Sequence, residues 1–202
     1  MDRHNVQFHL YADDTRFLDC CRSTDTASLR ARLTSCASDI ELWFRSRRLQ
    51  LNASKTEAIW FSSKPNLAKL NITDCSIQVG TSTIQQSAVV RDLGFHLDSE
   101  LSMKQHVAKV AAACFYHLSR LRQIRRQVGE EFTTQIVLAL VISRLDYCNS
   151  LLAGLPVCTT EPFQGVQNAA ALYSNSVRQT KPTPVTLAPI RWRVQFKLCC
   201  FM

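Results

Sequence analysis

The sequence lacks a long hydrophobic run. Its longest apolar stretch, residues 136–142, fits a buried helix and falls far short of the ~20 residues that a helix needs to cross a bilayer. The N-terminus opens with charged and polar residues, whereas a secretory signal peptide has an apolar centre. We therefore expect an intracellular protein that does not enter a membrane, with nucleus and cytoplasm both open.

The sequence also lacks the cysteine spacing of a zinc finger. It has 9 cysteines, an odd number, and no C-x-x-C pair. His106, Cys114 and His117 could share one helix face, but they supply only three ligands, and structural zinc sites use about four. The cysteines are therefore expected to be reduced and buried, as is usual inside cells.

Acidic residues are fewer than basic ones. The 202 residues include 24 Lys and Arg against 16 Asp and Glu, which gives a formal net charge of +8. This surplus favours a polyanionic partner, with nucleic acid as the leading candidate and a membrane surface as the weaker alternative. The hydrophobic fraction of 46% is enough to build one sizeable domain or two small ones.

Two adjacent carboxylates, Asp13 and Asp14, lie between two short apolar segments. Val6, Phe8 and Leu10 alternate with polar residues, and this pattern predicts the first strand of a hairpin with the acids near its bend. Neighbouring carboxylates repel each other, and a hard cation such as Mg²⁺ would offset that repulsion. The alternative is an ordinary solvated turn, because Asp is common in turns.

The segment from residue 27 to residue 97 mixes helix and strand patterns. Residues 27–48 are predicted to form a helix, residues 55–61 a strand, and residues 76–84 a hairpin. The helix has an apolar stripe of Leu29, Leu33, Cys36, Ile40, Trp43 and Phe44. In residues 89–97, Gly94 would let the backbone come close to a ligand; the alternative is a glycine in an edge strand.

The second half of the chain is predicted to be helical. A capping box at Ser102 is expected to begin a helix over residues 103–127, one side of which is apolar. Its other faces carry basic residues and no acid: Lys104, Lys109, Arg120, Arg122, Arg125 and Arg126. Such a face suits phosphate groups. The alternative is a solvated face, although solvated faces usually mix charges of both signs.

Three further segments are expected after Gly129. The first is a mostly buried helix whose inner face is formed by Phe132, Ile136, Leu140 and Leu145. Pro162 is expected to open a second helix over residues 163–177. Residues 180–189 contain three prolines and are predicted to form a loop, and residues 192–201 a strand or short helix.

Several motifs occur in a fixed order along the chain, and together they are more specific than any one of them. They are Tyr11-Ala12-Asp13-Asp14, Leu51-Asn52-Ala53-Ser54-Lys55-Thr56-Glu57, Asp92-Leu93-Gly94-Phe95, the segment from Ser143-Arg144-Leu145-Asp146-Tyr147-Cys148-Asn149 to Pro156, and Val166-Gln167-Asn168-Ala169-Ala170-Ala171. This series resembles the C-terminal half of a reverse transcriptase of the LINE type, that is, of a non-LTR retrotransposon. The resemblance covers nearly the whole chain.

The resemblance implies an α+β fold. A partial reverse-transcriptase palm, made of a small antiparallel sheet with a backing helix, would occupy residues 1–100. A helical thumb-like region would follow over residues 101–156, and a helical connector with a truncated C-terminal segment over residues 157–202.

The resemblance also implies roles for the candidate residues. Asp13 and Asp14 would be catalytic ligands of Mg²⁺, and Lys55 would be a catalytic acid that protonates the leaving pyrophosphate. The segment Leu93-Gly94-Phe95 would be the primer grip, which holds the end of the primer. The basic helix would follow the RNA/DNA template–primer duplex.

The first-strand aspartate and the fingers of this family would lie upstream of Met1. We therefore expect a fragment of an RNA-directed DNA polymerase that is inactive alone, binds Mg²⁺ weakly or not at all without the other half of the palm, and associates with that missing N-terminal half. The alternative is a basic, non-catalytic nucleic-acid-binding remnant.

Overall fold

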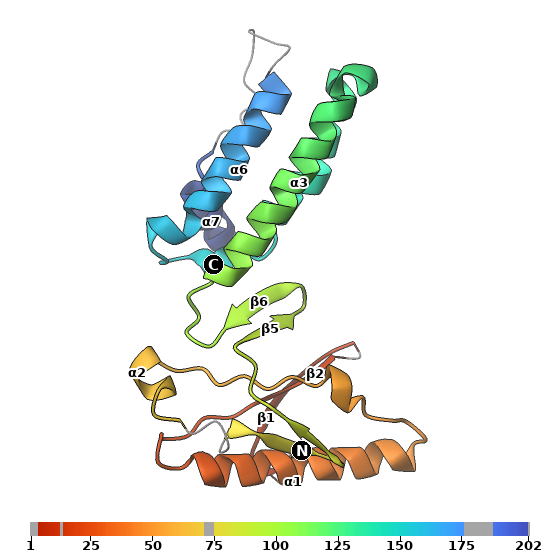
Figure 1. Cartoon of the computed structure of the whole chain (residues 1–202), viewed down its shortest axis with the longest axis vertical. Helices are drawn as coiled ribbons and strands as arrows, with labels where there is room; N and C mark the ends of the chain where they lie inside the picture. Colours follow the sequence, from red (N-terminus) through yellow and green to blue (C-terminus); the bar gives the residue numbers. More distant parts are fainter. Residues whose placement is uncertain (1–3, 13, 71–74, 176–187, 202) are drawn as a thin grey trace. The chain divides into compact units, whose positions relative to one another are not determined.

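The computed structural model describes residues 4–12, 14–70, 75–175 and 188–201, and the side chains of residues 174 and 175 are outside this description. The chain forms two compact units. Unit 1 comprises Met1–Val90 and Asp98–Leu101, and unit 2 comprises Arg91–Leu97 and Ser102–Met202. The α+β class predicted from the sequence is confirmed, because the described residues combine small antiparallel sheets with many helices (Figure 1).

Unit 1 begins with the predicted hairpin. Strands β1 (Gln7–Tyr11) and β2 (Asp14–Leu18) pair antiparallel, with Tyr11 opposite Asp14 and Phe8 opposite Phe17. Because side chains alternate between the two faces of a strand, Phe8 and Phe17 share one face and Asp14 lies on the other. Both strands are largely exposed, since this sheet has only two strands among the described residues.

Helix α1 (Thr26–Ser46) forms close to where its periodicity predicts. Leu29, Cys36 and Ile40 are buried on one side of it. Cys36 and Ile40 share a small core with Val6, and partly buried Phe17, Leu33 and Phe44 pack against this core. The assignment of Trp43 to the apolar stripe was wrong, because Phe44 takes the inward position at this end of the helix and Trp43 is 55% exposed.

The segment after α1 differs from the prediction at one strand. Residues 55–61 contain no extended strand, and only Ala58 forms an isolated bridge, with Gln86. The Asn52 side chain accepts a hydrogen bond from the Ser54 amide at 3.1 Å, and this local turn leads into the 3-10 helix η2 (Ala53–Lys55). An Asn side chain that bonds its own backbone competes with strand pairing, and this explains why no strand begins at Lys55.

Three short elements follow in unit 1. Helix α2 (Lys64–Leu67) lies between the segment predicted as a strand and the predicted hairpin. Strands β3 (Ile77–Val79) and β4 (Ser82–Ile84) form the predicted antiparallel hairpin. Gly80 turns that hairpin with a φ of +58°, a conformation in which side chains other than glycine are strained.

A third hairpin consists of β5 (Val89–Asp92) and β6 (Phe95–Asp98). Its two-residue turn is Leu93-Gly94, so Gly94 lies in the turn and not within an edge strand. The tip of the hairpin, Arg91–Leu97, belongs to unit 2. Phe95 is 4% exposed and is part of the unit 2 core.

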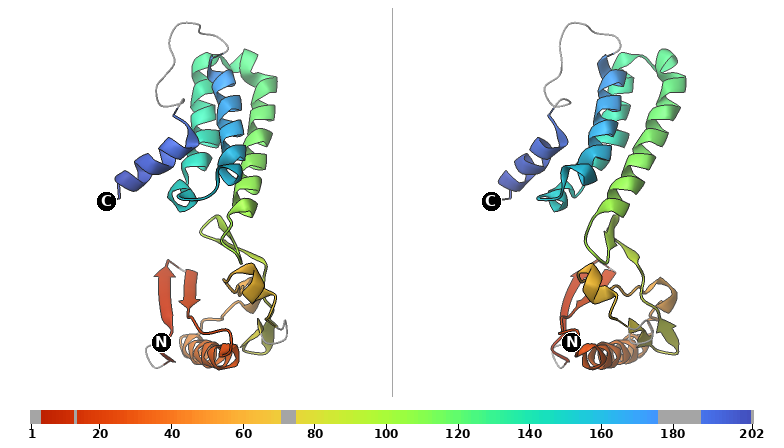
Figure 2. Two further views of the ribbon diagram at one scale, coloured as in Figure 1. Left: turned by 90° about the vertical axis from the view of Figure 1, so that its left-hand side faces the viewer. Right: turned by 60° about the vertical axis from the view of Figure 1, so that its left-hand side comes forward.

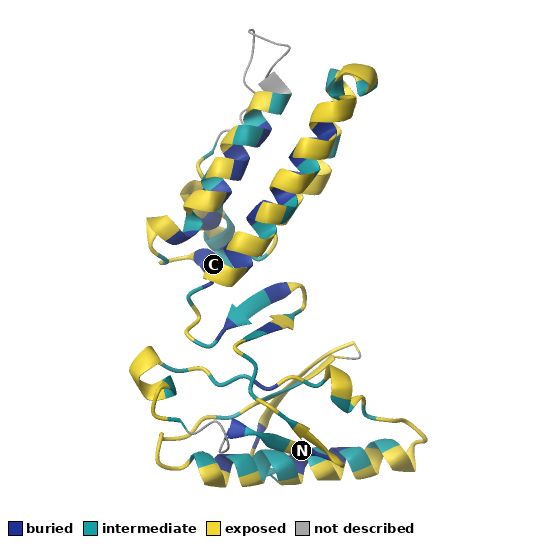
Figure 3. Ribbon diagram, in the orientation of Figure 1, coloured by how far each residue is buried: buried dark blue, intermediate teal, exposed yellow. Residues whose placement is uncertain are grey.

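Unit 2 is built from helices that run up and down alongside one another (Figure 2). Helix α3 (Lys104–Val128) packs against α6 (Val157–Asn175) and against the continuous helical segment formed by α4 (Glu130–Val137), the π-helical η4 (Leu138–Ile142) and α5 (Ser143–Asp146). The 3-10 helix η5 (Asn149–Leu152) and helix α7 (Ile190–Cys199) pack against each other. Buried residues line the inner sides of these helices (Figure 3).

The inner face of the α4–α5 segment was predicted one residue out of register. The residues that point inward are Thr133, Val137, Val141 and Leu145, whereas Phe132 is 61% exposed. Of the four residues predicted to face inward, only Leu145 is fully buried. Apolar residues occur on every side of this segment, so its periodicity could not identify the face, and the prediction that it is buried on most sides was also wrong.

Two predicted boundaries in unit 2 need correction. Pro162 lies inside α6 and does not open it, since α6 begins at Val157. The N-cap of α3 is Met103, one residue after the predicted Ser102; Met103 has a φ of +60° and makes no side-chain cap, while the Ser102 hydroxyl accepts a long hydrogen bond from the Lys104 amide at 3.5 Å. Residues 192–201 were predicted to form a strand or a short helix, and the helix is confirmed by α7. Most of the predicted loop over residues 180–189 lies outside the described residues.

The cysteines are less buried than expected. Cys36, Cys75 and Cys114 are buried, but five others are exposed: Cys20, Cys21, Cys158, Cys199 and Cys200. All nine are free thiols.

Candidate nucleic-acid interface

The acidic hairpin supplies one candidate ligand that can be placed. Asp13 lies outside the described residues. Asp14 is exposed at the start of β2, on the face of the hairpin opposite to Phe17, which packs into the core of unit 1. Over the described ranges, no group of three or more His, Cys, Asp or Glu side chains could hold a metal ion. The placed residues therefore do not by themselves fit a Mg²⁺ site.

Lys55 ends the 3-10 helix η2, where its side chain is exposed. The turn around it is held by Asn52, which accepts hydrogen bonds from the amide and the hydroxyl of Ser54, the latter at 2.6 Å. The motif that contains Lys55 thus builds a rigid local turn on the surface of unit 1. Its role as an acid remains a prediction.

An open groove of about 720 Å³ lies in unit 1 between the end of α1 and the β3–β4 hairpin. Glu41 and Arg45 line it and form an ion pair at 2.7 Å. The Glu41 carboxylate lies so close to Gly80 that a Cβ atom at this position would be 2.8 Å from one of its oxygens. Asp14 and Lys55 are not among its lining residues.

The Leu93-Gly94 turn has an unusual backbone. Leu93 has a φ of +45° and Gly94 a φ of +84°, so both central residues of this two-residue turn are left-handed. Such turns suit the twist of a hairpin, but they strongly favour Asn, Asp or Gly, and a left-handed Leu is strained. Strained residues of this kind persist only where surrounding contacts hold them.

Two helical elements of unit 2 hold this hairpin tip. The Tyr147 hydroxyl, which follows α5, donates a hydrogen bond to the Leu93 carbonyl oxygen. A side chain at Gly94 would begin 3.7 Å from the Tyr147 ring. The His106 ring of α3 stacks on Phe95 with the ring centroids 3.6 Å apart.

Charged residues of both signs lie at or near the hairpin tip: Arg91 and Lys109 act on His96, and Asp92 directly precedes Leu93. Burial lowers the pKa of His96, and the nearby charges of Lys109 and Arg91 lower it further. Burial, with His96 as a smaller contribution, lowers the pKa of His106 to about 4. The imidazoles of His96 and His106 are therefore neutral near pH 7.

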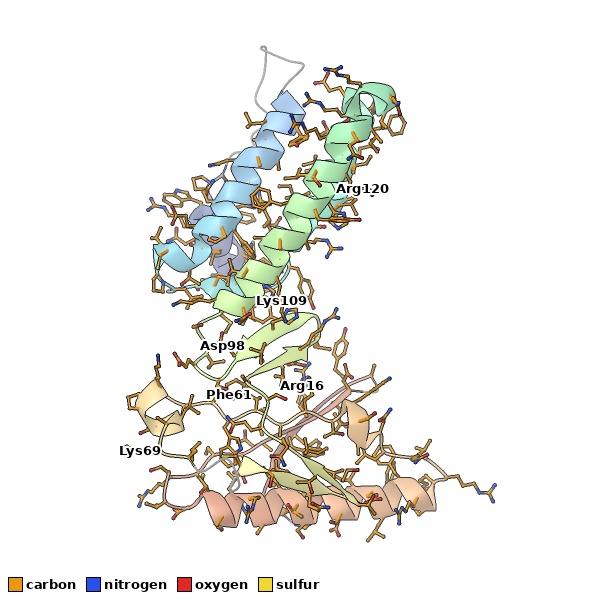
Figure 4. All side chains as sticks on the ribbon, viewed as in Figure 1. Arg16, Phe61, Lys69, Asp98, Lys109 and Arg120 are labelled. Carbon is orange, nitrogen blue, oxygen red and sulfur yellow. The ribbon has the colours of Figure 1, made fainter. Side chains whose placement is uncertain are left out.

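The basic helix is the strongest of the predicted sites. Five of its six predicted basic residues are exposed along α3: Lys104, Lys109, Arg120, Arg122 and Arg126. Lys109 and Arg120 are labelled in Figure 4 and lie three helical turns apart, about 16 Å along the axis. The helix contains no acidic residue.

The sixth residue, Arg125, points elsewhere. Its guanidinium lies 5.6 Å from the ring centroid of Tyr173 on α6, and it is half-buried. This position follows from helical geometry, because Arg125 is four residues after Leu121, which is buried in the core. The prediction that Arg125 belongs to the open basic face is therefore corrected.

Sequence reasoning assigned no role to a polar corner in unit 2. The Asp146 carboxylate accepts hydrogen bonds from Arg193 of α7, with Nε at 2.9 Å from Oδ1, and from the Asn149 side chain at 3.3 Å. Lys197 donates to the Asp146 carbonyl at 3.2 Å. The motif from Ser143 to Pro156 thus joins α7 to the end of α5 through Asp146. Tyr147, the residue after Asp146, contacts the hairpin tip.

Comparison with known proteins gives no match to any family model, curated protein or solved structure. Within the part of the chain that the structure describes, no helix has the length and apolarity to span a bilayer.

Proposed function

We propose that this chain is part of an RNA-directed DNA polymerase of the reverse-transcriptase type, and that its helical unit binds a nucleic-acid duplex through α3. The observation that carries the proposal is the face of α3, with five exposed cations and no acid in the helix. Charges placed along a rigid helix can each neutralise a phosphate and release a counterion, which favours binding. The ordered motifs of the sequence supply the polymerase half of the proposal.

The exposed positions suggest two groups of phosphate contacts. Lys109 and Arg120 lie on one side of the face, and Lys104, Arg122 and Arg126 lie on the other side by helical spacing. Lys109 is also close to the Leu93-Gly94 hairpin, as its effect on the pKa of His96 indicates. A duplex that contacts Lys109 would therefore pass near the segment that resembles the primer grip.

A second function makes use of the same basic face. The five exposed cations of α3 would also serve a non-catalytic protein that binds nucleic acid. Both functions require duplex binding, so the binding test comes first and activity separates them afterwards.

The test is a fluorescence-anisotropy titration of an RNA–DNA hybrid at several salt concentrations. K109Q/R120Q and R122Q/R126Q should each weaken binding and lower the slope of log K against log salt by up to about 0.9 per lost phosphate contact, the value for B-DNA. K64Q/K69Q removes two exposed lysines from unit 1 and is the charge-matched control. Equal slopes in all four proteins would refute the proposal.

A further inference from the structure

We infer that Tyr147 is a positioning residue that fixes the Leu93-Gly94 turn for contact with the end of a primer strand. The inference rests on the proposed function, because it gives that turn a nucleic-acid partner. Its structural basis is the hydrogen bond from the Tyr147 hydroxyl to the Leu93 carbonyl oxygen. Both residues belong to unit 2, although 54 positions separate them in the sequence.

The turn needs an external support. Leu93 is left-handed at a φ of +45° and 37% exposed, so neither its own conformational preference nor burial of its side chain explains why it stays there. The Tyr147 hydroxyl engages the backbone at this residue, and the Tyr147 ring lies against Gly94. A hydrogen bond to the carbonyl fixes the orientation of the Leu93–Gly94 peptide, which is the backbone group at the tip of the hairpin.

Tyr147 is itself held in place by its neighbours. It follows Asp146, which is bound by Arg193 and Asn149, and it precedes Cys148, which is left-handed with a φ of +53°. The phenol therefore extends from a fixed corner of the helical unit. The residue after Gly94, Phe95, is buried and stacks on His106. The turn is thus supported from two helices while its tip stays exposed.

The surroundings suit a phosphate or sugar at that tip. Lys109 and Arg91 are close enough to the hairpin for their positive charges to lower the pKa of His96, and Asp92 is the acidic residue directly before the turn. A backbone turn without a large side chain at Gly94 lets a strand terminus come close, and the two cations supply attraction for its phosphates.

The test uses the small number of glycines. The chain has 5 glycines, so labelling with ¹⁵N-glycine gives a short spectrum in which the Gly94 resonance is assigned by its loss in G94A. Y147F removes only the hydroxyl and should move the Gly94 resonance. Y173F is the matched control, because it keeps the ring under Arg125 and lies on α6, away from the turn in sequence. It should leave Gly94 unchanged.

Binding then separates positioning from stability. We compare a hybrid with a recessed primer 3′ end against a blunt hybrid of equal length. Y147F should reduce the preference for the recessed end about fivefold, the effect of one lost neutral hydrogen bond, while its affinity for the blunt hybrid stays the same. A merely structural role would lower both affinities together.

Each other result overturns the inference. An unmoved Gly94 resonance would show that Tyr147 does not hold the turn. A moved resonance with an unchanged end preference would show that the turn does not contact the primer, even though duplex binding through α3 could stand. A wild-type chain that binds no duplex would refute the proposed function together with the inference.

Discussion

The imidazole of His106 lies over the ring of Phe95, with 3.6 Å between the ring centroids and 24° between the planes. His106 is only 2% exposed, and its Nδ1 accepts a hydrogen bond from the His96 amide at 3.4 Å. The pair joins the tip of the β5–β6 hairpin to α3, so the packing of the hairpin depends on an imidazole that stays neutral.

The first prediction concerns pH. Burial lowers the pKa of His106 from 6.5 to about 4 in the folded state. Above pH 6.5 His106 is neutral in both the folded and the unfolded chain, so protonation of His106 does not lower the free energy of unfolding. Between pH 6.5 and 4 the unfolded chain binds a proton that the folded chain does not, so the free energy of unfolding falls, by up to about 3 kcal/mol.

Urea unfolding of the wild type and of H106F from pH 7.5 to 4.5 measures this effect. The stability difference between the two proteins should move in favour of H106F as the pH falls, because H106F has no imidazole to charge. V166A is the control, since it removes core packing without removing a titratable group, and its deficit should be the same at each pH. A constant difference for H106F would contradict the prediction.

The second prediction compares the effect on stability of replacing two glycines of unit 2 with alanine. Gly129 separates α3 from α4 with φ +85° and ψ 169°, a region that is nearly restricted to glycine. Gly165 lies inside α6, and a methyl group at either position would meet no atom within 4 Å. G129A should therefore destabilise unit 2 by about 1–3 kcal/mol through backbone strain. G165A should stabilise it by about 0.5–1 kcal/mol through helix propensity.

Thermal unfolding of the two variants measures both effects in the same structural unit. Because neither methyl group clashes, a difference in sign between the two midpoints reports backbone conformation alone. Destabilisation by both changes would mean that Gly165 has a packing role that the free space around it does not indicate.

The third prediction concerns the polar corner. Arg193 and Asp146 form an ion pair whose side chains are 12% and 34% exposed, supported by Asn149 and Lys197. A double-mutant cycle with R193A and D146A should give a coupling energy of about 1–2 kcal/mol. Glu41 and Arg45 form an ion pair on α1 in which Arg45 is 68% exposed, and their cycle should give only about 0.3–0.5 kcal/mol. Equal coupling in the two cycles would argue against a structural role for the corner.

Local patterns in the sequence predicted a good part of the fold. The β1–β2 hairpin, α1 and α3 were all found near their predicted positions, because alternation and helical periodicity depend only on neighbouring residues. The strand predicted over residues 55–61 did not form: a local turn held by the Asn52 side chain occupies its start, and only Ala58 forms a bridge with another segment.

The candidate site was predictable only where it lies on one element. The basic face of α3 could be recognised from composition, but the orientation of Arg125 toward Tyr173 depends on where α6 packs. The contacts that hold the hairpin tip and the polar corner join residues 54 and 47 positions apart. Such pairs follow from tertiary packing, and a single sequence carries no signal of which side chains will meet.

The last prediction is that a polypeptide of these 202 residues does not extend a primer on an RNA template with Mg²⁺. Two-metal catalysis requires carboxylates that converge on ions roughly 4 Å apart from more than one element. Asp13 and Asp14 are adjacent in one hairpin, and Asp14 has no cluster of further ligands among the described residues. Asp98 is a carboxylate that could replace the missing metal ligand. However, it is 9% exposed, and its Oδ1 accepts a hydrogen bond from the Glu100 amide at 3.2 Å.

Primer extension by the wild type and by D13A measures this, with the anisotropy titration run on the same preparations to show that duplex binding is intact. Both proteins should give the same background, because misplacement of reacting groups alone costs on the order of 100-fold in rate and here the ligand set itself is incomplete. Incorporation by the wild type that disappears in D13A would contradict the prediction. It would mean that Asp92, Asp98 or a second copy of the chain completes the metal site, and the polymerase proposal would then be favoured over the non-catalytic one.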